Sequence, residues 1–272
     1  MTSTFPINDI LLEQYEVKYM RLVLFSLGPI TIYSYGLMIA VGLIAGYILA
    51  LWTAKKLHCN KKHMDNLLFT ILVSGFLSSK ILYLLTNLSK ILEDPGFILD
   101  SLGGGWVVYG GILGGILGGY FYTRKHRLPF LRYFDWTMPS FALSQAFGRI
   151  GCFLAGCCYG CETTSHFSVV FPQGSLAPSG IPLVPTQLMS SAFDFCLCIF
   201  LVLLIRKKKW DGQIGCAYLI LYSLGRFIIE FFRGDLIRGS VGFLSTSQFI
   251  SIFTFAMGLA IWMWKNKSVK SK

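Results

Sequence analysis

Seven runs of mostly apolar residues constrain this chain more than any other feature of its sequence. Each run has about 20 residues, the length that a helix needs to cross the roughly 30 Å hydrocarbon core of a membrane. The approximate boundaries are residues 30–54, 66–88, 105–123, 135–157, 187–205, 213–233 and 246–264. A soluble domain carries about 25% charged residues, whereas only 14% of this chain is charged and 54% is apolar. The sequence therefore predicts an all-α integral membrane protein with about seven transmembrane helices, forming one membrane domain over residues 1–272.

The basic residues indicate how these helices are oriented. Most of the 24 Lys and Arg side chains follow the first, third, fifth and seventh runs. These are Lys55, Lys56, Lys61, Lys62, Arg124, Lys125, Arg127, Arg132, Arg206, Lys207, Lys208, Lys209, Lys265, Lys267, Lys270 and Lys272. Because basic loops stay in the cytoplasm, the carboxyl terminus is predicted inside and the amino terminus outside. This topology explains the net charge of +11, so we expect no nucleic-acid partner.

Two segments are predicted to lie outside the membrane. Residues 1–29 precede the first helix, and acidic residues near their start argue against a cleavable signal peptide. We expect an amphipathic interfacial helix within the first 27 residues. Residues 158–186, rich in Gly, Pro and Ser, are expected to form a small external head.

Several charged residues fall within or at the ends of the predicted spans: Lys80, Arg149, Arg226, Glu230 and Arg233. A charge at the centre of a bilayer costs about 2.5–3.5 kcal/mol on insertion scales, and such residues commonly mark a functional site. Lys80 and Arg233 lie near span ends, where structural pairing or contact with the membrane interface explains them equally well. Arg149 and Arg226 indicate a site more strongly.

Tyr222, Arg226 and Glu230 are spaced four residues apart, and Arg233 follows at the seventh position after Arg226. Residues at these spacings share one face of a helix. The polar stripe is therefore predicted to face protein or water, with Glu230 beside Arg226.

Arg149 stands between two glycines in the segment Gly148-Arg149-Ile150-Gly151. Glycines let other backbones approach and expose amide groups, which suits an anion site next to an arginine. Close helix packing is an alternative that explains the glycines but not the arginine. The same packing explains most of the glycine-rich segment 103–119, in which Tyr109 is a candidate buried hydrogen-bonding group.

Five short motifs occur in a fixed order across residues 28–235. They are Tyr35-Gly36-Leu37-Met38, Tyr109-Gly110-Gly111-Ile112, Gly148-Arg149-Ile150-Gly151-Cys152-Phe153, Pro185-Thr186-Gln187-Leu188 and Tyr222-Ser223-Leu224-Gly225-Arg226-Phe227-Ile228-Ile229-Glu230-Phe231-Phe232-Arg233. Together they resemble the motifs of the bacterial prolipoprotein diacylglyceryl transferases. Each motif is weak alone, but the ordered set is specific.

The resemblance implies a transferase of lipoprotein biosynthesis. Such an enzyme moves the diacylglyceryl group of phosphatidylglycerol to the thiol of a lipobox cysteine, in a prolipoprotein that still carries its signal peptide. A thioether forms and glycerol phosphate is released. The resemblance further implies a multi-pass protein of the bacterial plasma (inner) membrane, surrounded by membrane lipids, that acts as a monomer and uses no metal or other cofactor.

The resemblance also assigns residues to roles. The catalytic set is Arg149, Arg226, Glu230 and Tyr109, and the substrate-binding set is Tyr35, Gly110, Gly111, Gly151, Cys152, Gln187, Tyr222 and Arg233. Guanidinium groups suit the lipid phosphate, because they grip phosphate oxygens with two parallel hydrogen bonds. Glu230 is expected to orient Arg226 and to balance its charge.

The sequence departs from the family pattern at three positions. Tyr109 stands where the family has a histidine, Cys152 where it has an asparagine, and Cys157 where it has an acidic residue. These changes concern the acceptor and the proton transfer more than the lipid phosphate. Two alternatives therefore stay open: a lipid transferase of the same fold with a different acceptor, and a non-catalytic lipid-binding or transport protein.

Four of the eight cysteines cluster at Cys152, Cys157, Cys158 and Cys161. A metal site, a disulfide, a thiol that carries the lipid covalently, and simple packing are all compatible with this spacing. Only Cys158 and Cys161 have the two-residue separation typical of paired zinc ligands.

Overall fold

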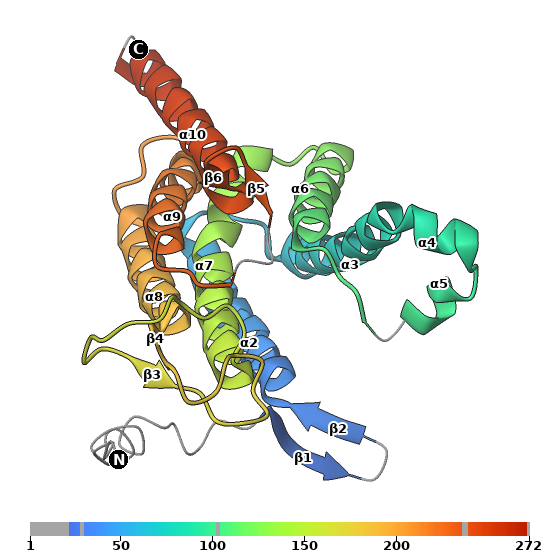
Figure 1. Cartoon of the computed structure of the whole chain (residues 1–272). Coiled ribbons are helices and arrows are strands. Elements are labelled where there is room, and N and C mark those ends of the chain that lie inside the picture. The colour runs from blue at the N-terminus through green and yellow to red at the C-terminus, as the bar shows by residue number, and fades with distance from the viewer. Residues whose placement is uncertain (1–21, 28–29, 102–103, 236–238, 271–272) are drawn as a thin grey trace, which may run out of the picture. The chain divides into compact units, whose positions relative to one another are not determined.

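The structure is a computed structural model that describes residues 22–27, 30–101, 104–235 and 239–270. The described residues are mostly helical (Figure 1). The chain divides into two compact units, a larger one of residues 1–56 and 135–272 and a smaller one of residues 57–134. Each unit is described by itself.

Four long helices and most of a fifth form the larger unit. They are α2 (Ser34–Lys56), α7 (Phe130–Ala155, in this unit from residue 135), α8 (Thr186–Ile205), α9 (Gln213–Glu230) and α10 (Thr246–Lys270). Three antiparallel strand pairs accompany them: β1 (Val23–Leu27) with β2 (Ile30–Tyr33), β3 (Val169–Val170) with β4 (Pro182–Leu183), and β5 (Ser240–Val241) with β6 (Leu244–Ser245). Helix α9 packs against both α8 and α10 (Figure 1).

The smaller unit contains α3 (Lys61–Thr86), α4 (Leu88–Glu93), α5 (Phe97–Asp100) and α6 (Val108–Lys125). Glycines hold α6 close against α3: a Cβ atom added at Gly110 would lie 2.6 Å from the carbonyl oxygen of Ser78, and one at Gly114 would lie 2.6 Å from that of Ser74. The backbones approach so closely that side chains larger than hydrogen have no room. Helix packing therefore accounts for these glycines.

Lys80 binds the segment that leads into α6. Its ammonium group donates hydrogen bonds to the carbonyl oxygens of Ser101 and, over 2.8 Å, Gly104. It also lies 4.9 Å from the centroid of a Trp106 ring. These contacts support the structural alternative for Lys80.

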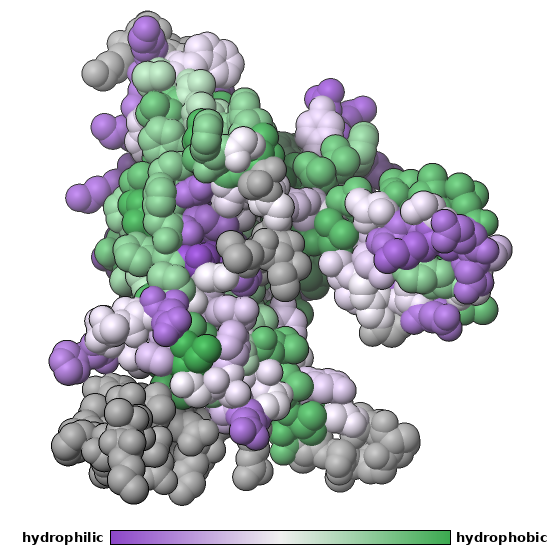
Figure 2. Space-filling view, in the orientation of Figure 1, coloured by the Kyte–Doolittle hydropathy of each residue, from purple (hydrophilic) through white to green (hydrophobic). Residues whose placement is uncertain are grey.

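A helix of at least 18 residues lies on each of the seven predicted runs. At the start of the first run, however, residues 30–33 form β2 and not part of the helix. Four segments, Ser34–Lys56, Lys62–Thr86, Thr186–Ile205 and Thr246–Lys267, are long and apolar enough to cross a membrane. Among the described residues, α6, α7 and α9 do not meet that standard. Large apolar side chains are exposed along the helices, and Figure 2 shows them over α8, α9 and α10. Exposure of this extent fits a lipid environment, so the prediction of a helical membrane protein is confirmed. The number of spans and their orientation stay predictions.

The amino-terminal segment only partly lies within the described residues. The expected interfacial helix falls mainly on residues 1–21, which are outside them. Residues Val23–Leu27 form β1 and pair with β2, so the helix prediction is wrong for this part. Valine, isoleucine, threonine and aromatic side chains in these two strands favour a pleated conformation over a helix.

Asp135 joins α7 to the start of α9. Its fully buried carboxylate accepts hydrogen bonds from the backbone N–H groups of Gly212 and Gly215 at 2.7 and 2.8 Å, and Lys208 lies 3.0 Å away. The first N–H groups of a helix lack partners within the helix, and a carboxylate also interacts favourably with the positive end of the helix dipole. This cap fixes the position of α9 along its axis relative to α7, and with it the position of the polar stripe on α9.

Candidate functional site

The end of α7 turns the cysteine segment back over the helix. Gly156 adopts a φ of 75°, and its N–H donates to the carbonyl of Phe153 while the N–H of Cys157 donates to that of Cys152, both at 3.1 Å. This is the Schellman arrangement, which glycine permits because it has no Cβ. In this motif a side chain just beyond the helix packs against one in the last helical turn. Here these residues are Cys157 and Cys152.

The start of α8 holds this turn in place. Thr186 donates from its hydroxyl to the carbonyl of Cys158, and Gln187 donates from Nε2 to the carbonyl of Cys157, both at 2.8 Å. Gln187 is 1% exposed. Its Oε1 atom is buried and has no hydrogen-bond partner in the described part of the chain.

Gly160 links three segments that are distant in the sequence. Its N–H donates to Val184 before α8, and the next residue, Cys161, donates to Phe232 after α9. A Cβ at Gly160 would lie 2.4 Å from the carbonyl oxygen of Val184, so only glycine fits. The ends of α7, α8 and α9 are thereby joined at one place.

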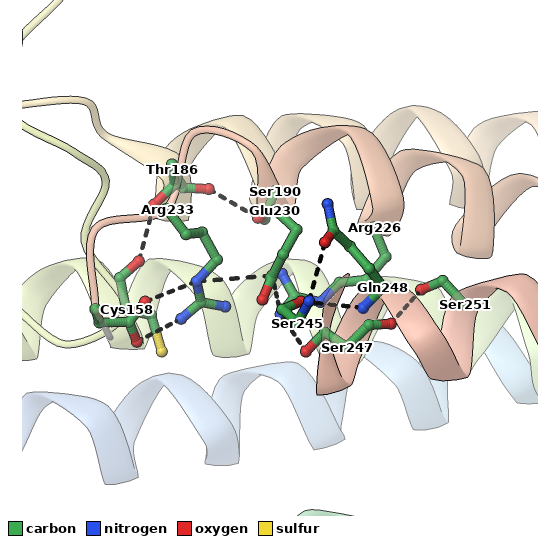
Figure 3. Close-up of polar contacts among 11 residues, drawn as sticks. Cys158, Thr186, Ser190, Arg226, Glu230, Arg233, Ser245, Ser247, Gln248 and Ser251 are labelled. Atoms are coloured by element: carbon green, nitrogen blue, oxygen red, sulfur yellow. Dashed lines mark hydrogen bonds and ion pairs between the residues drawn. The ribbon is translucent and has the colours of Figure 1, made fainter. Parts of the chain in front are cut away.

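The polar stripe predicted on α9 exists and is buried. The Arg226 guanidinium lies 2.6 Å from a carboxylate oxygen of Glu230, with side chains 12% and 8% exposed. Arg226 also donates a 2.9 Å hydrogen bond to the hydroxyl of Ser247 on α10 (Figure 3). The expected contact between Glu230 and Arg226 is therefore present.

Ser247 owes its position to the way in which α10 begins. The hydroxyl of Ser245 accepts a hydrogen bond from the N–H of Gln248, and the Gln248 side chain accepts one from the N–H of Ser245, both at 3.1 Å (Figure 3). This reciprocal pair is a capping box. It fixes the first turn of α10, which presents Ser247 to Arg226.

Arg233 lies just beyond α9 and is held by its own carboxylate partner. Two of its nitrogens bind the two oxygens of Asp235 at 2.9 and 2.7 Å. A weaker contact of 3.9 Å reaches Glu230. The bidentate pair neutralises Arg233 and ties the segment after α9 to the site.

Arg149 differs from these two arginines. It lies on α7, where its electrostatic neighbours include Tyr222, Cys152, Cys158 and Asp194. Across the described ranges, no hydrogen bond or ion pair engages its guanidinium group. A guanidinium group has five N–H donors, and no described residue uses those of Arg149.

Two of the three aromatic residues predicted at the site, Tyr35 and Tyr222, lie around Arg149. Tyr35 on α2 interacts electrostatically with Arg149 and with the neighbouring cysteines. A Cβ at Gly151 would lie 3.1 Å from the Tyr35 ring, so this glycine allows the close approach of α2. Tyr222 stacks on Tyr218 with a ring separation of 5.3 Å.

Asp194 is a site residue that the sequence analysis did not single out. It is 2% exposed, lies on α8, and is an electrostatic neighbour of both Arg149 and Arg226. The available signal was a charged residue in the middle of an apolar run, which is also the signal that identified Arg149.

The structure groups nine of the twelve predicted residues in the larger unit. These are Tyr35, Arg149, Gly151, Cys152, Gln187, Tyr222, Arg226, Glu230 and Arg233. Tyr109, Gly110 and Gly111 belong to the smaller unit. Tyr109 is at the beginning of α6 and is 41% exposed, whereas Gly110 is buried against α3.

Comparison with known proteins supplies the family. The model of the family described as prolipoprotein diacylglyceryl transferase matches residues 22–264. This chain belongs to that family. The chain is 46% identical over 243 residues to phosphatidylglycerol–prolipoprotein diacylglyceryl transferase 2 of Clostridium perfringens, covering 89% of this chain and 94% of the relative. It is 46% identical over 242 residues to the transferase of Clostridium tetani (89% and 96% covered). It is 33% identical over 249 residues to that of Clostridioides difficile (92% and 97%).

Within this member of the diacylglyceryl transferase family, four of the five motifs contribute to the cluster in the larger unit. They supply one cation without a partner among the described residues, a buried ion pair and several hydrogen-bonding side chains, surrounded by helices with apolar outer faces. Buried positive charge beside apolar helix faces has the chemistry that an anionic group attached to a lipid would require.

Proposed function

We propose that this protein transfers the diacylglyceryl group of phosphatidylglycerol to the thiol of a lipobox cysteine in a prolipoprotein. The observation that carries the proposal is the buried guanidinium of Arg149, which no described residue engages and which lies one turn before Cys152 on α7. The family and the names of the relatives support the same reaction.

The reaction replaces one bond to carbon with another. The acceptor sulfur bonds to the terminal glycerol carbon of the diacylglyceryl group, the bond from that carbon to the phosphate oxygen breaks, and glycerol phosphate leaves with the bonding electrons. The thiol loses its proton, since the thiolate is the nucleophile, and this proton passes to the released glycerol phosphate or to solvent. Negative charge that develops on the departing phosphate requires fixed cations in a site that excludes water.

Arg149 is proposed to hold the phosphate directly. Arg226 assists from α9, where Glu230 and Ser247 fix its orientation. Fixed groups stabilise a transition state without reorganising at the moment of reaction. Arg233, paired with Asp235, is proposed to contribute mainly by keeping the end of α9 in place.

The remaining residues are assigned to substrate positioning. Tyr35, Gln187 and Tyr222 line the site, with Cys152 and Gly151 on the facing surface of α7, and Asp194 balances the positive charge of the arginines. Tyr109, with Gly110 and Gly111, is proposed to serve the acceptor or the proton transfer, at the position where the family has a histidine.

We further propose that the protein crosses the bacterial plasma membrane seven times as a monomer. The amino terminus and the head of residues 158–186 would lie outside, and the carboxyl terminus would lie in the cytoplasm. In this topology the joined ends of α7, α8 and α9 are on the outer side, where secreted prolipoproteins and the outer lipid leaflet are both accessible.

The test uses the full chain purified in detergent, with phosphatidylglycerol labelled in its acyl chains and a synthetic lipobox peptide. The proposal predicts a diacylglyceryl adduct in the mass of the peptide and an equal amount of released glycerol phosphate. Replacement of the lipobox cysteine of the peptide by serine should abolish the adduct.

Two other outcomes lead to the alternatives. Release of glycerol phosphate without an adduct would indicate a lipid transferase with another acceptor, to be sought among small thiols and amines. Lipid binding with neither product would support the non-catalytic protein. When a site arginine is replaced in this assay, the Arg206→Gln variant serves as the control. It changes an exposed arginine at the end of α8 and so measures the general effect of removing a cation.

A further inference from the structure

Three thiols converge where α7 ends, beside the proposed lipid site. The sulfur atoms of Cys152, Cys157 and Cys158 all lie within 4.8 Å of one another. In a tetrahedral site with metal–sulfur bonds of about 2.3 Å, the sulfurs would be ~3.8 Å apart. Small side-chain rotations are therefore enough to bring all three onto one ion.

The conformation of the backbone brings the three thiols together. The Schellman turn at Gly156 returns Cys157 to Cys152, and Cys158 adopts a φ of 64°, a region that non-glycine residues seldom occupy. The hydrogen bonds from Thr186 and Gln187 hold the two carbonyl groups of this turn. The thiols are thus presented by a fixed loop, so little conformational entropy is lost when they bind a ligand.

The surroundings of the cluster suit an anionic metal–thiolate centre. Three thiolates exceed a divalent cation by one negative charge, and the guanidinium of Arg149 is an electrostatic neighbour of Cys152 and Cys158. A buried charge is stable only when it is compensated in this way.

Gln187 supplies a second, independent indication of a ligand. Its amide contacts the carbonyl of Cys157 through Nε2, while its buried Oε1 has no hydrogen-bond partner among the described residues. An unsatisfied buried acceptor costs about 1–3 kcal/mol. A ligand bound at this turn would give the oxygen a partner.

We propose that Cys152, Cys157 and Cys158 form a site for a thiophilic divalent cation of the Zn²⁺ and Cd²⁺ type. Binding replaces three S–H bonds by three sulfur–metal bonds and releases the protons to solvent. The sequence spacing favoured Cys158 with Cys161 as a metal-binding pair, but Cys161 is exposed and is not part of the cluster.

Cadmium titration of the reduced, full-length protein in detergent tests the proposal. We expect one Cd²⁺ per chain, a thiolate-to-cadmium absorption band in the near ultraviolet, and competition by Zn²⁺. The Cys157→Ser variant should lose at least about tenfold in affinity, since even changes outside the ligand set cost 10- to 100-fold. Cys161→Ser and Cys196→Ser, which change exposed thiols, should bind as the unchanged protein does.

A second measurement needs no variant and covers the case in which Cys157→Ser does not fold. Bound Cd²⁺ should protect Cys152, Cys157 and Cys158 from alkylation, as read by mass spectrometry of their peptides, while Cys161 remains reactive. Equal labelling of the partly exposed Cys157 and Cys158 with and without Cd²⁺ would overturn the proposal, and so would a disulfide among the three that forms in spite of Cd²⁺. Because neither measurement uses lipid or peptide, its outcome is independent of the transferase assay.

Discussion

Arg149 and Arg226 carry the same guanidinium group in different surroundings. Arg226 is held by Glu230 and Ser247, whereas no hydrogen bond or ion pair to Arg149 occurs among the residues that the structure describes. A buried cation without a partner is unfavourable unless a ligand compensates it. At the scale of single residues, we therefore propose that Arg149 is the cation that binds the anion and that the ion pair of Arg226 and Glu230 supports it.

Replacing Arg149 by Gln tests this division. We expect turnover to fall at least about 100-fold, the order of magnitude found when a group that stabilises developing charge is removed. The rate of glycerol phosphate release measures the effect, with Arg206→Gln as the matched control. A near-normal rate in Arg149→Gln would remove the proposed phosphate role.

The Tyr109→Phe variant tests the residue that replaces the family histidine. Phenylalanine keeps the ring and deletes only the hydroxyl, so a loss of turnover of about tenfold or more is expected if that hydroxyl transfers a proton, since positioned acid–base groups contribute about 10²–10⁴-fold. Adduct formation on the lipobox peptide is the readout, and Tyr120→Phe, another tyrosine of α6, is the control. Unchanged turnover would leave Tyr109 as a packing residue.

At the scale of elements, helix termini place the site. The Schellman turn closes α7, Asp135 caps α9, and the Ser245–Gln248 box opens α10. Each of these caps satisfies backbone groups that would otherwise lack partners in a low-dielectric environment. The functional side chains are near these ends, so capping and positioning are the same contacts.

Removing the Asp135 carboxylate by Asp135→Ala should destabilise the larger unit by about 3–5 kcal/mol, because Lys208 and two buried N–H groups would lose their partner. Thermal unfolding in detergent should show a clearly lower midpoint. Asp211→Ala is the matched control, since Asp211 contacts the same lysine at 2.7 Å but its side chain is 34% exposed. Equal midpoints for the two variants would contradict the importance of the cap.

At the scale of the whole molecule, the exposed apolar surface and the alternating basic loops both indicate a protein inserted in a membrane. Loops rich in Lys and Arg resist translocation. The loops after residues 54, 123, 205 and 264 should therefore all lie in the cytoplasm.

Topology reporters check this prediction. A reporter active only outside the membrane, fused after residue 104 or within 158–186, should be active, and one fused after residue 209 or at the carboxyl terminus should be silent. Labelling of single introduced cysteines by a membrane-impermeant reagent gives an independent readout. Activity of the reporter at the carboxyl terminus would contradict an odd number of spans with the amino terminus outside.

The helices and much of the candidate site were predictable because both depend on local patterns in the sequence. Runs of about 20 apolar residues specify helices in a membrane, and the four-residue spacing of Arg226 and Glu230 specifies their contact. The motif order indicated the family without any structure. The β1–β2 pair was not predicted, because short apolar segments fit a strand as well as a helix.

Tertiary structure alone decided which side chains from different helices meet. Nothing local in α8 shows that Asp194 is an electrostatic neighbour of the arginines of α7 and α9, or that the oxygen of Gln187 has no hydrogen-bond partner among the described residues. Likewise, the spacing of the cysteines could not separate Cys161 from the three that converge. Such contacts depend on how helix faces pack and where caps set their heights, and these are long-range properties that sequence periodicity does not encode.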